Sequence, residues 1–259
     1  PHVDSYYAAT AHPAPTHPRL QGAAGFDVCV VGAGIAGCAS ALELAERGYR
    51  VALLEAERVG WGASGRSGGQ AIFGYGTSQA SLAAQVGPEI ARRMWEVSID
   101  ALDWVRARVA RHAIDCDLNW GHLHAATKPR QRDELLELQR ELAEVYGYHS
   151  PRFLERRDVE GLLATQRYCA GLFDPRSGHL HPLNYTLGLA RAAAAAGVKI
   201  FEASPVTRIE RGEPARVVTP HGTLTTRFVV LTRGGYVAGL RTGSEWRVMP
   251  VGTYVVATE

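Results

Sequence analysis

The sequence predicts an α/β fold, in which a parallel, Rossmann-like sheet domain is interleaved with a second α+β domain. Two observations predict it. An apolar run at Phe26–Val31, typical of a strand buried on both faces, leads through a glycine-rich turn into a helical stretch at Cys38–Arg47. A second apolar strand follows at Val51–Leu54, so the segment has the strand–helix–strand order of a parallel unit.

The composition excludes several classes of protein. Of 259 residues, 46% are hydrophobic and 21% are charged, which rules out disorder, collagen and a coiled coil. No apolar run approaches the ~20 residues that a membrane helix needs. The net charge of +2 comes without a concentrated basic patch, so no nucleic-acid partner is expected.

The cysteines indicate a reducing compartment. All four are scattered without a C-x-x-C pair, so neither a disulfide framework nor a zinc site is expected. The segment Pro1–Leu20 is polar and proline-rich, without the apolar stretch of a signal peptide. We therefore expect a cytoplasmic protein.

The elements beyond the first unit are predicted from periodicity and breakers. Residues 1–25 should form an extended arm, because closely spaced prolines cannot sustain a helix. Gly60–Gly76 is glycine-rich and irregular, and two long amphipathic helices follow at about Glu89–Arg111 and Arg130–Tyr146. Their expected buried stripes are Ile90, Met94, Val97, Ala101, Val105 and Val109 on the first, and Leu135, Leu138, Leu142 and Val145 on the second.

The last part of the chain is predicted to hold one more helix and several short strands. The helix, Leu183–Ala196, begins after Pro182 and ends at Gly197. A Pro-His-Gly turn at 220–222 joins two of the strands as a hairpin. The expected strands are Lys199–Ala203, Val206–Glu210, Arg216–Thr219, Thr223–Thr226, Phe228–Thr232 and Arg247–Ala257.

The strongest motif is the turn Gly32-Ala-Gly34-Ile-Ala-Gly37. Gly32 permits a tight turn, Gly34 lets a pyrophosphate approach the backbone, and Gly37 lets helix and strand pack closely. The phosphates would sit at the positive end of the helix. Glu55, at the end of the next strand, is placed to accept hydrogen bonds from ribose hydroxyls, which implies an unmodified 2′-hydroxyl. The pattern predicts dinucleotide binding.

A second motif is the glycine-rich loop Gly60–Gln70. Its glycines leave backbone N–H groups available for an anion or a ring edge. Ser64 and Ser67 add hydroxyl donors, and Arg66 adds a positive fork for phosphate. The loop follows Glu55 closely, which favours a binding role over that of a flexible surface loop.

These residues resemble a known family. Gly32–Gly37, Glu55 and the sequence Gly-Ala-Ser-Gly-Arg-Ser-Gly-Gly at 62–69 are similar to the FAD-binding signature of the glycine oxidase and D-amino-acid oxidase family. The stretches Ser5–Thr10 and Gly178–Leu189 are closer to its gamma-glutamylputrescine oxidoreductase branch. The resemblance implies a Rossmann-like FAD domain with an interleaved substrate domain.

The resemblance also implies which residues bind the cofactor. The turn would hold the FAD pyrophosphate and Glu55 the adenosine ribose, while Val206 would bind adenine by its backbone and the segment at 232–234 would close over the nucleotide. The implied set is Gly32, Gly34, Ile35, Ala36, Gly37, Glu55, Ala56, Ala63, Ser64, Gly65, Arg66, Ser67, Gly68, Gly69, Gln70, Val206, Thr232, Arg233 and Gly234.

The implied domains are an arm (1–25), two segments of the FAD domain (26–85 and 181–240), a substrate-side insertion (86–180) and the start of the substrate-domain sheet (241–259). Family members are longer, so the chain resembles their first portion, which alone should be inactive, aggregation-prone and weaker in FAD binding.

The resemblance implies oxidation of a C–N bond in an amine or amino acid. Hydride would pass to the flavin N5, the resulting imine would be hydrolysed, and oxygen or an electron carrier would reoxidise the flavin. No catalytic residue is identified. Two alternatives stay open: an NAD-dependent dehydrogenase, and a truncated, non-catalytic nucleotide-binding fragment.

Histidines are the remaining candidates. His122 and His124, and likewise His179 and His181, place paired imidazoles on one face of an extended segment, but no acid or cysteine completes a ligand set, so no metal is expected. His181, before Pro182, is expected to fix the turn into the helix or to line the substrate side. No histidine or cysteine lies between Glu55 and His112, so FAD should be non-covalent.

Overall fold

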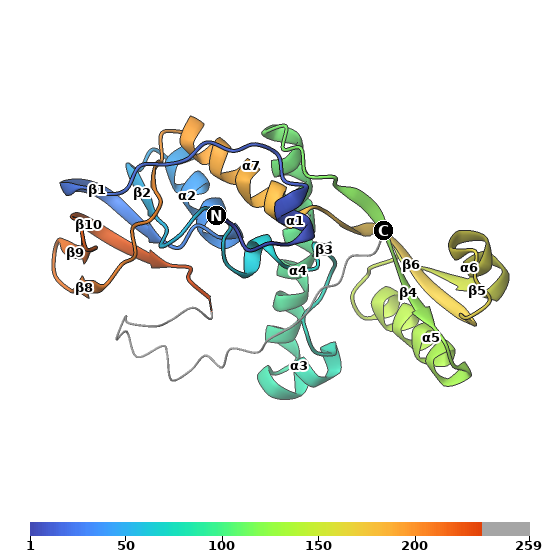
Figure 1. Ribbon diagram of the computed structural model, residues 1–259. Helices are drawn as coiled ribbons and strands as arrows, with labels where there is room; N and C mark the ends of the chain where they lie inside the picture. The colour runs from blue at the N-terminus through green and yellow to red at the C-terminus, as the bar shows by residue number, and fades with distance from the viewer. Residues whose placement is uncertain (235–259) are drawn as a thin grey trace. The chain divides into compact units, whose positions relative to one another are not determined.

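The computed structural model describes residues 1–234, which form two units (Figure 1). Unit 1 comprises Pro1–Gly69, Arg111–Cys116 and the described chain from His181 onward, and unit 2 comprises Gln70–Ala110 and Asp117–Leu180. The expected domain boundaries stay predictions: the one between residues 85 and 86 compares with a division after Gly69 in the structure, and the one between residues 240 and 241 lies outside the described residues.

Unit 1 is built on a six-stranded sheet in the order β7-β2-β1-β10-β9-β8. Four neighbouring strands are parallel, and β9 and β8 continue the sheet antiparallel. The strands are β1 (Gly22–Val31), β2 (Val51–Leu54), β7 (Lys199–Phe201), β8 (Arg208–Glu210), β9 (Ala215–Val218) and β10 (Gly222–Leu231).

The register of this sheet aligns the ends of three strands. Val31 of β1 pairs with Leu54 of β2 on one side and with Leu231 of β10 on the other. The carboxyl ends of parallel strands are where ligands bind in open α/β sheets. The segments that follow these residues therefore meet at one edge of the sheet.

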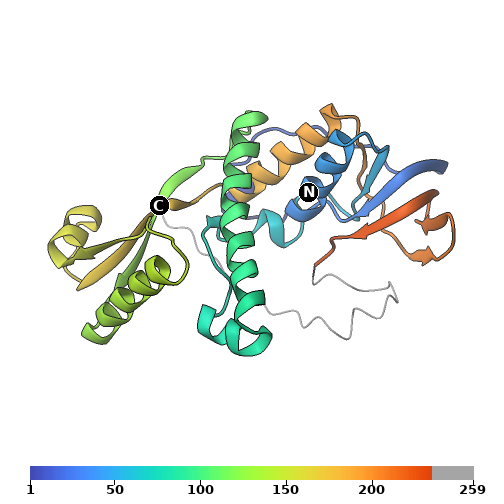
Figure 2. The ribbon, with the colours of Figure 1, turned by 180° about the vertical axis from the view of Figure 1, so that it is seen from behind.

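Two helices of unit 1 lie side by side in both views of the ribbon (Figures 1 and 2): α2 (Ile35–Glu46) and α7 (Pro182–Ala195). His181 is the N-cap of α7, and its Nδ1 accepts a hydrogen bond of 3.1 Å from the backbone N–H of Asn184. The expected role of His181 in fixing the turn is therefore confirmed. A short helix, α1 (Tyr6–Ala9), packs on α7.

Apolar side chains from β1, β2, β9 and β10, together with Leu20, form a core cluster of this sheet. The buried members are Leu20, Cys29, Val31, Ala52, Leu54, Val217 and Leu224. Strands β1 and β2 are buried on both faces toward their carboxyl ends, which is why they lack a polar–apolar alternation.

Unit 2 holds an antiparallel sheet in which β6 (Ala170–His179) pairs with β3 (Gln70–Ala71), β4 (Asn119–Ala126) and β5 (Arg152–Glu155). Its helices are α3 (Gln79–Val86), α4 (Pro88–Arg111), α5 (Pro129–Glu144) and α6 (Arg156–Leu163). No helix in the described part of the chain is both long enough and apolar enough to cross a bilayer.

Several predicted elements need correction. The arm is not wholly extended, because Ser5 caps the short helix α1, and β1 begins at Gly22 inside the expected arm. The strands expected at 223–226 and 228–232 form one strand, β10, because it pairs with β1 over almost its whole length. Helices α3 and α6 and strands β3–β6 were not predicted individually, and Arg247–Ala257 lies outside the described residues.

The buried face of α4 also differs from the predicted stripe. Ile90 and Val97 are 53% and 61% exposed, whereas Ala91, Trp95, Ser98 and Leu102 are buried. The reason is aromatic packing: the Trp95 ring lies 4.8 to 5.6 Å, centroid to centroid, from Phe73, Tyr146 and Tyr148. These contacts turn the neighbouring face of the helix inward. On α5, Leu135 and Leu142 are buried as expected, but Val145 is 52% exposed.

Because Leu102 is buried and Val97 is exposed, truncating these two residues of α4 should have different effects on stability. We expect Leu102→Ala to lower the free energy of unfolding by about 2 kcal/mol or more, because it leaves a cavity at a side chain that is 4% exposed. Val97→Ala should change it by less than about 0.5 kcal/mol, since it alters an exposed side chain. Urea unfolding of both variants measures this, and equal losses would contradict the observed face.

Candidate functional site

The candidate site begins at the turn between β1 and α2. Gly32 has a φ of +103°, in the region that favours glycine, and its N–H donates to the carbonyl oxygen of Leu54 at 2.7 Å. A Cβ on Gly37 would overlap the carbonyl oxygen of Gly32. The helix therefore starts directly against the end of the strand, so its N-terminal N–H groups face the same edge of the sheet as the strand ends.

Ser64 completes the N-terminus of α2 from another segment. Gly34 is the N-cap and offers no side chain, and Ser64 Oγ, from the 3₁₀ turn η1 (Ala63–Gly65), accepts a hydrogen bond of 3.0 Å from the N–H of Ile35. A Cβ on Gly34 would lie 2.6 Å from this hydroxyl oxygen. The predicted glycine-rich loop is thus in contact with the predicted turn.

Glu55 is bound to the backbone on both sides. Its Oε2 accepts from the N–H of Ala33 at 2.7 Å, and its Oε1 accepts from the N–H of Glu57 at 3.0 Å. Burial raises the pKa of Glu55 above its usual value, while the hydrogen bonds from Ala33, Glu57 and Ala56 act in the opposite direction. The carboxylate is therefore fixed in orientation at the edge where the strands end.

The end of β10 covers the turn from the other side. Thr232 donates its N–H to the carbonyl oxygen of Val31 at 2.9 Å, and its hydroxyl to the carbonyl oxygen of Gly32 at 2.9 Å. A Cβ on Gly32 would lie 3.2 Å from the Thr232 backbone and 3.3 Å from the Cα of Arg233. The segment from Thr232 to Gly234 is thus adjacent to the turn.

These segments enclose a cavity of about 340 Å³ within unit 1. Among the predicted residues, those in its wall are Gly32, Gly34, Glu55, Ala56, Ala63, Ser64, Val206, Thr232, Arg233 and Gly234. The other predicted residues do not line it: Ile35, Ala36, Gly37, Gly65, Arg66, Ser67, Gly68, Gly69 and Gln70, of which Gln70 belongs to unit 2. The structure therefore brings together segments that lie far apart in the chain.

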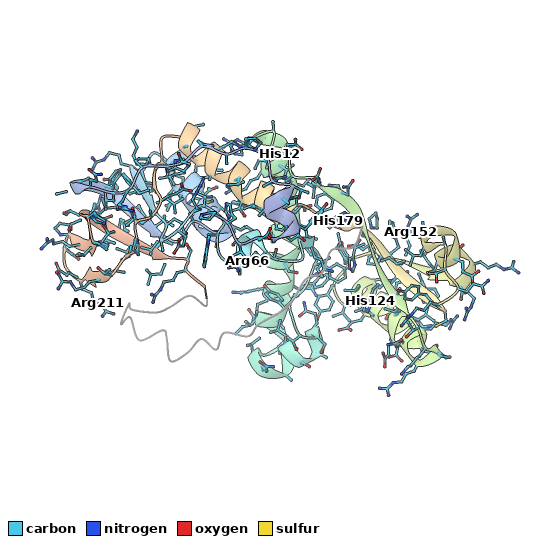
Figure 3. All side chains as sticks on the ribbon, in the orientation of Figure 1. His12, Arg66, His124, Arg152, His179 and Arg211 are labelled. Carbon is cyan, nitrogen blue, oxygen red and sulfur yellow. The ribbon has the colours of Figure 1, made fainter. Side chains whose placement is uncertain are left out.

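Sequence reasoning missed part of the wall, namely Val31, Leu54, Glu57, Ser204 and Pro205, and it included Trp61 and Gly62 only as members of the glycine-rich loop, not as individual binding residues. Trp61 had a usable signal, since it is the one aromatic residue within Gly60–Gln70. Arg66, labelled in Figure 3, lies with its guanidinium 5.1 Å from the centroid of the Trp61 ring and donates its Nε–H to the carbonyl oxygen of Gly62 at 3.3 Å. Both contacts hold Arg66 against its own loop.

The paired histidines lie elsewhere. His122 and His124 line a separate cavity of about 170 Å³ in unit 2, together with Asp174 and apolar side chains. Burial and the neighbouring His124 lower the pKa of His122, although Asp174 opposes this. Within residues 1–234, no three histidine, cysteine, aspartate or glutamate residues are grouped so that they could hold a metal ion.

Comparison with known proteins gives a family match. The family described as DAO, FAD dependent oxidoreductase, matches residues 27–259. The chain is 38% identical over 263 residues to the probable oxidoreductase OrdL of Haemophilus influenzae, and 38% identical over 260 residues to gamma-glutamylputrescine oxidoreductase of Escherichia coli. Each match covers 100% of this chain and 61% of the relative, so the chain spans about three fifths of the length of these curated relatives.

Solved structures show the same fold. The L-amino acid deaminase of Proteus myxofaciens, in complex with anthranilate, superimposes with a TM-score of 0.73 at 28% identity, over 88% of this chain and 49% of that one. The glycine oxidase of Bacillus cereus gives a TM-score of 0.66 at 22% identity, over 85% of this chain and 58% of that one.

Proposed function

From the fact that the chain belongs to the family of FAD-dependent oxidoreductases described as DAO, we propose that its unit 1 cavity binds the ADP part of FAD. The observation that carries the proposal is the position of Glu55, whose carboxylate is held by the N–H of Ala33 within the glycine-rich turn. The predicted FAD fold, the family and the oxidoreductase class agree with the comparisons.

The residues present fit this cofactor. The glycines at 34 and 37 let Ser64 and the end of β1 pack directly against the start of α2. Gly32, Gly34 and Ser64 line the cavity, so the N-terminus of this helix lies at its wall, where a pyrophosphate would be favoured. In this proposal the turn holds the pyrophosphate, Glu55 accepts from the ribose hydroxyls, and the backbone at Val206 binds adenine. FAD, when bound, supplies the electron acceptor for the oxidation.

We propose further that the whole protein oxidises a C–N bond of an amine or amino acid, with a substrate similar to gamma-glutamylputrescine, and that oxygen or an electron carrier takes up the electrons. The 38% identity to gamma-glutamylputrescine oxidoreductase of Escherichia coli supports this substrate class. None of the four cysteines, all of which lie within residues 1–234, forms a disulfide, which supports the proposed cytoplasmic location.

The cofactor should be bound without a covalent bond. Burial raises the pKa of the Cys29 thiol to about 12, and it also raises that of Cys38, so neither thiol near the turn is a nucleophile at neutral pH. Acid precipitation of the purified full-length gene product should therefore release FAD into the supernatant. Chromatography then identifies the cofactor, and release of NAD or FMN in place of FAD would contradict the proposal.

The substrate is tested with the same preparation. Anaerobic addition of gamma-glutamylputrescine should bleach the flavin absorbance, while free putrescine serves as the matched compound without the glutamyl group. Flavin that stays oxidised with both of these compounds, and with other amines and amino acids, would overturn the proposed activity and leave the FAD assignment intact.

A further inference from the structure

Glu202 is a buried carboxylate outside the predicted site. It follows β7 and is 5% exposed. Its Oε1 accepts a hydrogen bond of 2.9 Å from the N–H of Val59, its Oε2 accepts one of 3.0 Å from the N–H of His17, and Arg58 Nε lies 3.3 Å from Oε2 as an ion pair. One side chain therefore joins three segments that are distant in sequence.

Two of these segments form the wall of the proposed FAD cavity. Arg58 and Val59 lie between the lining residues Glu57 and Trp61, and Ser204 lines the cavity two residues after Glu202. The two loops also bond directly, since the N–H of Ser204 donates to the carbonyl oxygen of Glu55 at 2.8 Å. Glu202 thus lies directly behind the wall and contacts both loops that build it.

The backbone between these groups is held in an unfavourable conformation. Ala203, next to Glu202, has a φ of +47°, in the left-handed region that a residue with a Cβ rarely adopts. Its N–H donates to the carbonyl oxygen of Glu57 at 2.9 Å. Such a conformation persists only where the surroundings impose it, and the bonds of Glu202 on either side of the turn are part of those surroundings.

The third segment is the extended stretch at 11–21. Its prolines lack N–H groups, and three of the N–H groups that remain bond to other segments of unit 1: His17 to Glu202, Leu20 to Ser204 Oγ at 3.0 Å, and His12 to Asn184 Oδ1 at 2.8 Å. Ser204 Oγ in turn donates to the carbonyl oxygen of Glu202 at 2.8 Å. The extended stretch therefore bonds to the same loop from behind.

We propose that Glu202 is a positioning residue for the adenosine end of bound FAD. It fixes the loop at 55–62 and the loop at 202–206 in the arrangement that faces the nucleotide, so that binding does not have to order them. The inference rests on the proposed FAD site. Without the carboxylate, two backbone N–H groups and the Arg58 guanidinium lose their acceptor, and the loops must rearrange to satisfy them.

Glu202→Ala and Glu202→Gln test this in the full-length gene product, with Asp27→Ala and Asp27→Asn as matched controls. Asp27 is a carboxylate of the same sheet that accepts from the Arg50 N–H at 2.9 Å and from its guanidinium at 3.1 Å. It thus has the same types of donor, but it does not line the cavity. The measurements are the Kd for FAD of the apoprotein, competition by AMP, and the Tm of the apoprotein.

We expect Glu202→Ala to raise the Kd for FAD at least tenfold and to weaken AMP binding, measured by competition, by a similar factor. Glu202→Gln should lie between it and the wild type, because the amide keeps one acceptor oxygen for two N–H donors. The Asp27 variants should lower the Tm and leave both affinities within twofold. If Glu202→Ala does not fold, an increase of at least threefold in the Kd of Glu202→Gln supports the proposal.

The opposite outcomes are equally distinct. A lower Tm with an unchanged Kd for FAD in the Glu202 variant that folds would reduce Glu202 to a structural role and overturn the inference. A weaker affinity for FAD with unchanged competition by AMP would place the effect away from adenosine and overturn it too. A wild-type protein that binds no FAD overturns the proposed function itself, and this is seen before any variant is compared.

Discussion

Replacing Gly37 by alanine is expected to destroy the proposed FAD site, because the added Cβ would overlap the carbonyl oxygen of Gly32 and lie 2.7 Å from Thr232 Oγ1. The first of these neighbours is backbone at the end of a buried strand and cannot rotate away. Overpacking in a well-packed interior costs ~1–3 kcal/mol, and a clash with backbone belongs at or above the upper end of that range. We expect a loss of more than about 3 kcal/mol in the free energy of unfolding.

Two other glycines make this a graded experiment. A Cβ on Gly34 meets only the Ser64 side chain, at 2.6 Å from Oγ and 3.4 Å from Cβ. The hydroxyl can rotate away at the cost of its bond to the N–H of Ile35, so Gly34→Ala should cost about 1 kcal/mol. A Cβ on Gly68 meets nothing within 4 Å, so Gly68→Ala should leave stability unchanged. Urea unfolding and the FAD content of each purified variant measure the series. Equal stability of Gly37→Ala and Gly68→Ala would refute the close packing.

The first part of the fold could be predicted because local signals agree with the tertiary structure. Val51–Leu54 is a strand with the predicted bounds, since the apolar run is buried on both faces and is flanked by the polar residues Arg50 and Glu55. The glycines at 32–37 predict the turn, because the backbone there has to approach a neighbouring segment closely. In such places the residue type itself carries the structural information.

The buried face of α4 could not be predicted in this way. Its sequence holds two overlapping apolar stripes, one with Ile90 and Val97 and one with Trp95 and Leu102. Which of them is buried depends on Phe73, Tyr146 and Tyr148, which come from other elements. The periodicity of a single helix gives no information about those packing partners.

The candidate site also contains residues that could be predicted from the sequence and residues that could not. Glu55 and the turn have a recognisable spacing, whereas Ser204 and Pro205 reach the cavity because β7 lies beside β2 in the sheet. Glu202 has no sequence signal at all, since a single glutamate after a short strand is most simply a surface residue. Its burial depends on donors from the segments around His17 and Val59.

Glu55→Gln is expected to weaken FAD binding by a factor on the order of 30 to 100, with two causes that act together. Hydrogen bonds to a charged acceptor are worth ~1.5–3 kcal/mol and neutral ones ~0.5–1.5 kcal/mol, so two bonds to ribose hydroxyls lose ~2 kcal/mol or more. Both carboxylate oxygens also accept backbone N–H groups, from Ala33 and Glu57. The NH₂ of glutamine must face one of these donors.

The second cause changes what the experiment should measure. An N–H group left without an acceptor costs stability in the apoprotein as well, so Glu55→Gln should lower the Tm before any cofactor is added. Glu210→Gln is the control, because Glu210 is paired with Arg208 and Arg216 on the antiparallel side of the same sheet. An unchanged Kd for FAD in Glu55→Gln would remove Glu55 from the site.

The pH dependence of the affinity for FAD should distinguish the contribution of the Glu55 carboxylate from that of the other residues of the site. Burial holds the pKa of Glu55 above its usual value, so the group takes up a proton at a higher pH than an exposed glutamate, whose pKa is ~4.3. As the pH falls through that raised pKa, the neutral acid is a weaker acceptor than the carboxylate, and the affinity for FAD should fall.

The stability of the apoprotein should change in the opposite direction, because a group with a raised pKa in the folded state contributes stability at low pH that is lost as the pH rises through that pKa. Lowering the pH from neutral should therefore weaken FAD binding while the contribution of Glu55 to apoprotein stability increases. Glu55→Gln should remove both responses, and a variant that keeps the wild-type pH profile of the Kd would assign the titration to another group.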